Sequence, residues 1–262
     1  MSLESHLGRG SSDIGRVFAR DLQRDVYAIV GLLSCISCLS NLNQDLRNHG
    51  DSPHDQTHTY TALASDIESF IKEHSLPRPV LIGHSMGAKA AMVVALRSKV
   101  PISALISVDN APVDAALKSD FASYTRGMLR IADANVQKQS EADAILAEYE
   151  PSLPVRQFLL TNLARDKEDG IQKWRIPVKT LAASLDHMAD FPFKDPEDAR
   201  YEGPTLFVRG TKSRYVADET LPVVGRFFPK FRLVDVESGH WVISEKPEEF
   251  RRAVVEFLQD LD

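Results

Sequence analysis

The chain has 262 residues, of which 43% are hydrophobic and 26% charged, the proportions of a globular protein large enough for a substantial core. Its formal net charge is -6 and no cluster of Lys and Arg stands out, so nucleic-acid binding is not expected. The only two cysteines, Cys35 and Cys38, exclude a disulfide framework, and their surroundings lack the strand–helix context of a redox pair and the further ligands of a zinc site.

The N-terminal region shows neither a secretory signal nor a membrane span. Residues 1–16 lack the apolar run of a signal peptide, so secretion is not expected. Residues 27–44 carry no charge, but Ser, Asn and Gln side chains interrupt them. A spanning helix needs about 20 predominantly apolar residues, so we do not expect this segment to cross a membrane.

From residue 79 onward, short apolar runs alternate with helical patterns. The run at 79–82 predicts a buried parallel strand, and residues 88–99, rich in Ala, Met, Leu and Lys, predict the helix that follows. Further strands are predicted at 102–109, 204–210 and 231–238, and an amphipathic helix at 247–261. Such alternation predicts an α/β fold whose mostly parallel sheet carries helices on both faces.

The segment 111–196 differs from the rest, because it shows helical patterns and little strand signal. These patterns lie at 114–134, 140–150 and 155–166. An insertion between two strands at the active-site end of a sheet would form a helical cap. We therefore predict a core made of residues 1–110 and 197–262, and a helical cap made of residues 111–196.

A nucleophile motif lies between the first of these strands and its helix. Gly83-His84-Ser85-Met86-Gly87 fits the pattern G-x-S-x-G in the required strand–turn–helix context. A strained turn there would lift the Ser85 hydroxyl above the sheet, and the flanking glycines avoid collisions with neighbouring backbone. The N–H of Met86 could then point at a developing oxyanion. We predict Ser85 as the nucleophile and Met86 as an oxyanion donor.

The base and the acid are expected after later strands. His240 follows the last predicted strand, and an imidazole is suited to take the proton of a serine near neutral pH. In folds with this motif the chain order is Ser, then Asp or Glu, then His. Asp109 ends the strand after the motif helix and is the preferred acid. Asp218, beyond the strand at 204–210, is the alternative.

Three further residues are candidates for roles at this site. Ser213 is expected either to hydrogen-bond the assembly as an auxiliary member or simply to cap a turn. His84 and Trp241, the neighbours of Ser85 and His240, are expected to contact the substrate. No metal site is predicted. The three residues with helical metal-ligand spacing lie in a polar, loop-like stretch; they are His54, Asp55 and His58.

Five segments together carry a resemblance to a known family. They are Asp45–His54 (DLRNHGDSPH), Gly83–Met92 (GHSMGAKAAM), Val108–Asp114 (VDNAPVD), Arg209–Val216 (RGTKSRYV) and Ser238–Val242 (SGHWV). The chain resembles the α/β-hydrolase superfamily, in particular the group of mitochondrial abhydrolase domain-containing protein 11 and its fungal and bacterial esterase relatives. The resemblance implies an acid at Asp109, a serine near the histidine at Ser213, and a mitochondrial location, with the cytoplasm as the alternative.

The chain departs from this family at two places. Members begin with strands that lead to an HGLFGS-like loop, which supplies the second oxyanion donor, and these N-terminal strands are missing here; residues 13–29 resemble the helix and strand that follow that loop. Residues 30–44 interrupt the run into DLRNHG, and we interpret them as a probable insertion from a translated intron. A mature transcript that retains the codons of residues 30–44 would rule the intron out.

These observations predict a serine hydrolase that cleaves carboxylic esters or thioesters through an acyl-enzyme on Ser85. His240 serves as base, Asp109 orients it, and small acyl esters or thioesters are the partners, with no metal or organic cofactor. Two alternatives stay open. Fungal members of the family include acyltransferases that make acetate esters from alcohols, and a non-catalytic binding protein can be built on the same fold.

Overall fold

The computed structural model describes residues 26–28, 42–115 and 120–261. The predictions for the N-terminal strands, for Cys35 and Cys38, and for most of the insertion at 30–44 lie outside these residues. The chain divides into two compact units. The described residues of the first are 26–28, 42–44, 67–112 and 193–261, and those of the second are 45–66, 113–115 and 120–192.

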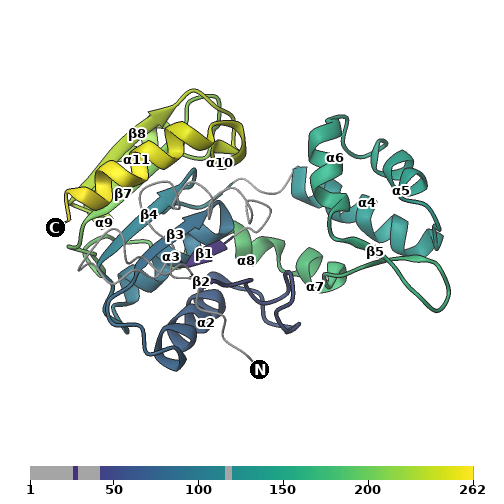
Figure 1. Cartoon of the computed structure of the whole chain (residues 1–262), viewed down its shortest axis with the longest axis horizontal. Helices are drawn as coiled ribbons and strands as arrows, with labels where there is room; N and C mark the ends of the chain where they lie inside the picture. Colours follow the sequence, from purple (N-terminus) through teal and green to yellow (C-terminus); the bar gives the residue numbers. More distant parts are fainter. Residues whose placement is uncertain (1–25, 29–41, 116–119, 262) are drawn as a thin grey trace, which may run out of the picture. The chain divides into compact units, whose positions relative to one another are not determined.

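A six-stranded sheet forms the centre of the first unit (Figure 1). Its strand order is β2-β1-β3-β4-β7-β8, and β3, β4, β7 and β8 are parallel neighbours. The strands are β1 (Val26–Ala28), β2 (Leu42–Asn43), β3 (Val80–His84), β4 (Ala104–Val108), β7 (Thr205–Gly210) and β8 (Phe231–Val236). In this sheet β1 pairs antiparallel with β2 and with β3, and the other three pairs are parallel, so the prediction of a mostly parallel sheet is confirmed.

The apolar runs of the sequence explain the position of each parallel strand. Every residue of β3 and β4 is buried, as expected for central strands covered on both faces, whereas all residues of the edge strand β8 except Val236 are half-buried or exposed. The register pairs His84 with Val108, Val108 with Val208, and Gly210 with Val236. The carboxyl ends of these strands therefore lie along one edge of the sheet.

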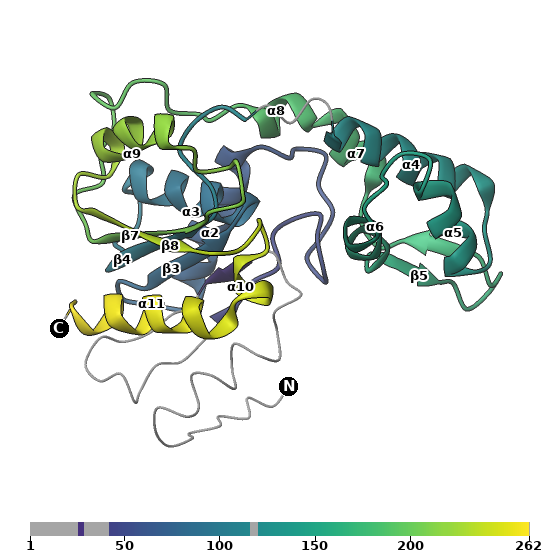
Figure 2. The ribbon, with the colours of Figure 1, turned by 90° about the horizontal axis from the view of Figure 1, so that it is seen from above.

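Helices cover both faces of this sheet, as predicted. Figure 2 shows α3 (Met86–Arg97) and α9 (Leu221–Phe227) on one face and α11 (Pro247–Gln259) on the other. The apolar side of α11 buries Phe250, Val254 and Phe257 in the core against β-strand residues such as Ile106. The first unit also contains the short helix η2 (Asp218–Thr220) and α10 (Val242–Glu245), and helix α2 (Tyr60–Glu73) has residues in both units.

The second unit is largely helical and has a separate apolar core. Its elements are α4 (Asp120–Ala134), α5 (Gln139–Leu146), α6 (Leu153–Leu160), β5 (Leu163–Arg165), β6 (Gln172–Trp174), α7 (Val178–Ala183) and α8 (Leu185–Ala189). Met128, Ile131, Leu146 and Leu160 are buried together in its core. Trp174 closes this core from β6, where its Nε1–H donates to the carbonyl of Met128 at 2.8 Å.

One predicted helix of this unit is wrong at its C-terminal end. The helix expected over 155–166 stops at Leu160, and Leu163–Arg165 instead pairs antiparallel with Gln172–Trp174. The reason is the turn between them. Gly170 takes a φ of 73°, which favours glycine, and the Asp166 N–H donates to the Ile171 carbonyl at 2.8 Å.

Residues 45–66 pack with the helical segment of the second unit. The guanidinium of Arg175 pairs with Asp51 at 2.9 Å, and Nε2 of His54 lies 3.0 Å from the Arg175 carbonyl. The predicted boundaries of a cap at 111 and 196 stay a prediction. In the part of the chain that the structure describes, no helix combines the length and apolar character needed to cross a membrane.

Candidate active site

Ser85 lies in a strained turn between β3 and α3. Its φ of 52° and ψ of -115° belong to a region that non-glycine residues rarely adopt, so the surrounding structure must hold it there. The Ser85 N–H donates to the Val108 carbonyl of β4 at 3.0 Å. A Cβ at Gly83 would lie 2.3 Å from the Gly87 carbonyl oxygen, so the turn requires glycine at this position.

His240 links the hydroxyl of Ser85 to a carboxylate. Its Nε2 lies 2.9 Å from Ser85 Oγ, and its Nδ1 lies 2.7 Å from Asp109 Oδ2. A carboxylate only accepts, so Nδ1 carries the hydrogen and Nε2 is free to accept from the serine. The three residues predicted as nucleophile, base and acid are therefore brought into one hydrogen-bonded chain.

Asp109 is fully buried just beyond the C-terminal end of β4. Its backbone N–H donates to the Val208 carbonyl at 2.8 Å, and Oδ1 accepts the Gly210 N–H at 3.0 Å. With Oδ2 on His240, both carboxylate oxygens have partners, as a buried charge requires. A Cβ at Gly210 would lie 2.1 Å from the Gly239 carbonyl oxygen, so the strand and the histidine loop approach closely at this glycine.

Asp218, the alternative acid, lies in a different environment. Its side chain is 81% exposed and pairs with the guanidinium of Arg209. Arg209 also pairs with Asp235 at 2.7 Å, and these two carboxylates raise the pKa of the guanidinium above its usual value. Among the contacts of the described residues, none joins Asp218 to His240, so the geometry favours Asp109.

Ser213 shapes a turn beside His240. Its N–H donates to the Gly210 carbonyl at 2.9 Å, and its Oγ accepts the Tyr215 N–H at 3.3 Å. The hydrogen bonds of the described residues include none from Ser213 to Asp109 or His240, so turn capping is the role that these contacts support. The same turn brings the ring of Tyr215 to 4.2 Å from the His240 ring, centroid to centroid.

His84 and Trp241 both lie beside the imidazole of His240. Their ring centroids are 4.8 Å and 5.5 Å from it. His84 is 6% exposed, and its Nε2 donates to the backbone carbonyl of His240 at 2.8 Å. Burial, followed by the charge of His240, lowers the pKa of His84 to about 4, so its ring is neutral near pH 7. Contact of either residue with a substrate stays a prediction.

The N-terminal end of α3 lies directly after the serine. Met86 is the first residue of this helix, and the first N–H groups of a helix have no intrahelical partners. Such N–H groups also carry the positive end of the helix dipole. The position is therefore suited to the oxyanion-donor role predicted for Met86.

Asn110 was not predicted from the sequence as a residue of the site. Its Nδ2 donates to the Ser85 carbonyl at 2.9 Å, and its Oδ1 accepts the Ala111 N–H at 2.9 Å. Ser107 fixes the same turn, because its Oγ donates to the Asn110 carbonyl at 3.0 Å. The available signal for Asn110 was its position directly after Asp109 in the segment VDNAPVD.

The histidines with metal-like spacing belong to the second unit and have other partners. His58 is buried, its Nδ1 lies 3.2 Å from Asn48 Nδ2, and burial lowers its pKa to about 4. Asp55 accepts the Thr57 N–H at 2.6 Å and pairs with Arg47 at 3.2 Å. Within residues 26–28, 42–115 and 120–261, no group of three or more His, Cys, Asp and Glu residues could hold a metal ion.

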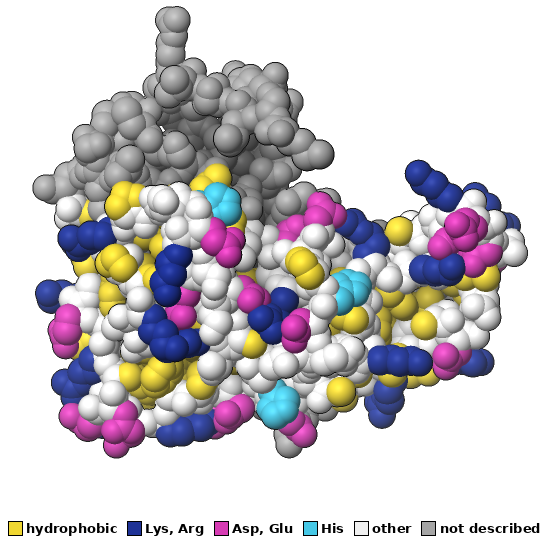
Figure 3. Space-filling view, turned by 90° about the horizontal axis from the view of Figure 1, so that it is seen from below, with side chains coloured by type: hydrophobic (Ala, Val, Ile, Leu, Met, Phe, Trp, Pro, Cys, Tyr) yellow, Lys and Arg dark blue, Asp and Glu magenta, His cyan; other side chains and the backbone are white. Residues whose placement is uncertain are grey.

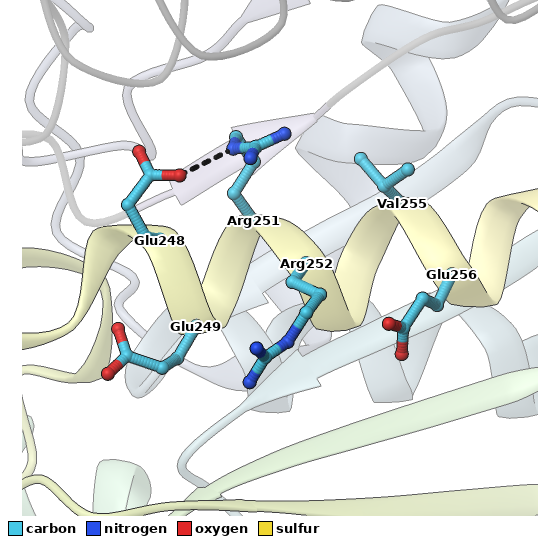
Figure 4. Close-up of a pocket in the computed structure, with 6 residues that line it drawn as sticks. All are labelled: Glu248, Glu249, Arg251, Arg252, Val255 and Glu256. Carbon is cyan, nitrogen blue, oxygen red and sulfur yellow. Dashed lines mark hydrogen bonds and ion pairs between the residues drawn. The ribbon is translucent and has the colours of Figure 1, made fainter.

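On the face in Figure 3, basic and acidic side chains are interspersed rather than gathered by sign. A hollow lies along α11, and its lining residues are Glu248, Glu249, Arg251, Arg252, Val255 and Glu256 (Figure 4). Arg251 donates to Glu248 there at 2.9 Å. The described residues of this lining include no nucleophile and no imidazole, unlike the site at Ser85.

The chain is similar to several known proteins. A family model described as alpha/beta hydrolase fold matches residues 44–247. An abhydrolase domain-containing protein of Schizosaccharomyces pombe is 39% identical over 253 residues, which are 96% of this chain and 88% of that protein. A probable alcohol acetyltransferase of Saccharomyces cerevisiae is 37% identical, over 94% of this chain and 72% of its own length.

The chain is also similar to a lipase in sequence and to an esterase in structure. The sn-1-specific diacylglycerol lipase ABHD11 of Xenopus laevis is 36% identical over 227 residues, which are 83% of this chain and 70% of that protein. Among solved structures, a marine microorganism esterase superposes with a TM-score of 0.74 at 29% identity, covering 84% of this chain and 85% of its own.

Proposed function

The chain belongs to the α/β-hydrolase fold family, and from this premise we propose that it is a serine hydrolase that cleaves carboxylic esters or thioesters through an acyl-enzyme on Ser85. The observation that carries the proposal is the hydrogen-bonded chain from Ser85 Oγ through His240 to Asp109, with distances of 2.9 and 2.7 Å. Nucleophile, base and orienting carboxylate within hydrogen-bond reach are the geometry that this chemistry needs.

Acylation begins when Ser85 Oγ attacks the acyl carbonyl carbon while His240 Nε2 takes the hydroxyl proton. Asp109 keeps Nδ1 protonated and stabilises the imidazolium that forms. The oxyanion of the tetrahedral intermediate is stabilised by the Met86 N–H at the start of α3. When the intermediate collapses, the leaving alcohol or thiol takes the proton from Nε2 and the acyl group stays on Ser85.

Deacylation repeats these steps with water. The imidazole, now neutral again, takes a proton from a water molecule as the water oxygen attacks the acyl carbon. Collapse of the second intermediate releases a carboxylic acid, and the proton on Nε2 returns to Ser85 Oγ. His84 beside this imidazole is neutral near pH 7, so it does not oppose the positive charge that develops on His240.

The substrate class rests on the relatives. A lipase and an esterase with similar sequences support small-molecule carboxylic esters as substrates.

The mitochondrial location is part of the same proposal and rests on the family resemblance alone. Cell fractionation with a tagged chain tests it; recovery outside mitochondria would contradict it.

Labelling with a fluorophosphonate probe tests the proposal directly. We expect the chain to label, Ser85→Ala to abolish labelling, and Ser65→Ala to leave it unchanged. Ser65 serves as a matched control because it is a half-buried helix serine whose Oγ donates to the Thr61 carbonyl. A folded chain that does not label, or that still labels without Ser85, would contradict the proposal; the first outcome would favour a non-catalytic binding protein.

Acyl transfer to an alcohol is a second candidate function. The similarity to a probable alcohol acetyltransferase over 94% of this chain favours it, and the chemistry differs only in the second nucleophile. With a p-nitrophenyl ester and ethanol, an acyltransferase would form the ethyl ester faster than the free acid. A hydrolase would release mainly the acid under the same conditions.

A further inference from the structure

The ring of Tyr215 lies against the imidazole of His240. The two centroids are 4.2 Å apart and the planes meet at 34°, so the rings face one another. The other aromatic neighbours of this imidazole are farther away: His84 at 4.8 Å and Trp241 at 5.5 Å. Tyr215 is half-buried, so part of its ring is removed from water where it meets His240.

The loop that carries Tyr215 is tied to the same carboxylate that binds His240. The Gly210 N–H donates to Asp109 Oδ1 at 3.0 Å, and the following residues bond back to the carboxyl end of β8. Ser213 then closes the turn, because its N–H binds the Gly210 carbonyl and its Oγ accepts the Tyr215 N–H at 3.3 Å. The ring is thus held at a fixed place beside the imidazole.

We propose that Tyr215 is a positioning residue whose ring holds the imidazole of His240 and stabilises the imidazolium formed during acylation, and that Ser213 holds the turn that presents this ring. The proposal rests on the proposed function of Ser85 and His240. An aromatic face within about 6 Å of a cation attracts it through the ring quadrupole. The attraction appears only when His240 is protonated, so it favours the transition state over the ground state.

The other groups that face His240 come from three elements. Asp109 at the end of β4 supplies the negative charge at Nδ1, and Ser85 after β3 supplies the hydroxyl at Nε2. His84 from β3 is neutral and binds the backbone carbonyl of His240. Near the loop itself, the Glu245 carboxylate accepts the Gly239 N–H at 2.8 Å. Tyr215 is thus the group from the β7 loop that faces the imidazole.

Rates of fluorophosphonate labelling against pH test this role in the full chain. Tyr215→Leu should label about 3- to 30-fold more slowly, the range expected for a lost cation–π contact, and the midpoint of its pH–rate profile should move to lower pH. The midpoint moves to lower pH because loss of the ring destabilises the imidazolium of His240, so the neutral imidazole persists at lower pH. Tyr215→Phe keeps the ring. Its labelling rate should lie within about twofold, and its midpoint within about 0.2 pH units, of the values for the unmodified chain.

Two more variants separate this role from general damage. Ser213→Ala should shift the rate and midpoint in the same direction as Tyr215→Leu, but less. Phe231, the first residue of β8, is a half-buried aromatic residue whose ring packs on Phe207 of β7. Phe231→Leu removes this ring and should leave the labelling rate unchanged. Thermal melts would show that each variant is folded.

The outcomes separate this inference from the proposed function. If the unmodified chain does not label, the proposed function fails. If the unmodified chain labels and a folded Tyr215→Leu variant keeps its rate or its midpoint, the role of Tyr215 is overturned. Equal loss in Tyr215→Phe and Tyr215→Leu would also overturn it, because the ring face would then not be the active feature.

Discussion

His240 is held at three atoms by three residues. Asp109 binds its Nδ1, Ser85 binds its Nε2, and the Nε2–H of His84 binds its backbone carbonyl. The first two contacts set the tautomer and the direction of proton transfer. The third fixes the loop from which the imidazole projects.

Replacing each candidate acid distinguishes their roles. We expect Asp109→Asn to lower the labelling rate by about 10³-fold or more, because an amide in place of the carboxylate favours the wrong imidazole tautomer. Asp218→Asn should leave the rate within about twofold, since this exposed side chain pairs with Arg209 rather than His240. Labelling rates of both variants provide the check, and the opposite ranking would move the acid to Asp218.

Replacing His84 tests the contact with the loop carbonyl. His84→Leu leaves that carbonyl without its donor, which costs about 1–3 kcal/mol and should slow labelling about tenfold or more. His84→Gln can still donate and should recover much of the rate. The comparison is between labelling rates of the two folded variants, and equal rates would show that the hydrogen bond does not position His240.

Chain order and strand ends were sufficient to predict Ser85 and His240 at one edge of the sheet, and they made Asp109 the preferred acid while leaving Asp218 as the alternative. They were not sufficient for Tyr215, Asn110 or the bond from His84. These contacts depend on how two loops approach each other in space, and nothing local in the sequence marks which neighbour faces the imidazole.

The elements of the parallel sheet were predictable because each is a short, continuous apolar run. β5 was not, because its residues Leu163–Arg165 continue a helical pattern and become a strand only by pairing with β6. The pair Asp169-Gly170 was the available turn signal, and the Asp169 carboxylate does accept the Ile171 N–H at 2.9 Å. Tertiary pairing overrode local helix propensity in this hairpin.

The turn from β3 to α3 should tolerate no side chain at position 83. Gly83→Ala should abolish labelling and lower the free energy of unfolding, because the new Cβ would lie 2.3 Å from the Gly87 carbonyl oxygen. Gly225→Ala in α9 is the matched control. Its Cβ would lie 3.4 Å from Phe231, and alanine in a helix interior gains up to about 1 kcal/mol over glycine. Urea unfolding of both variants measures the contrast.

Each compact unit contains a buried histidine that must be neutral in the folded chain: His84 in the first and His58 in the second. Burial lowers the pKa of each from 6.5 to about 4. An unfolded chain binds more protons between these values than the folded chain does. The stabilisation is therefore complete above pH 6.5 and is lost as the pH falls towards about 4.

Urea unfolding at pH 7 and near pH 4.5 checks this expectation for the molecule as a whole. Each histidine should contribute up to about 3 kcal/mol of the difference in unfolding free energy. His58→Gln should reduce the pH dependence, whereas replacing the exposed His74 by Asn should preserve it. If His58→Gln and the unmodified chain lose equal stability on acidification, protonation of His58 does not control the acid response.

The carboxyl end of β4 serves both reacting groups. The Val108 carbonyl holds the Ser85 N–H, Asp109 holds His240, and Asn110 holds the Ser85 carbonyl. Nucleophile and base are therefore both attached to the same strand end. Small movements of the sheet displace the two residues together and leave the distance between them unchanged. In amide hydrogen exchange, the N–H groups of Ser85 and Asp109 should be among the slowest and should lose their protection in the same opening event.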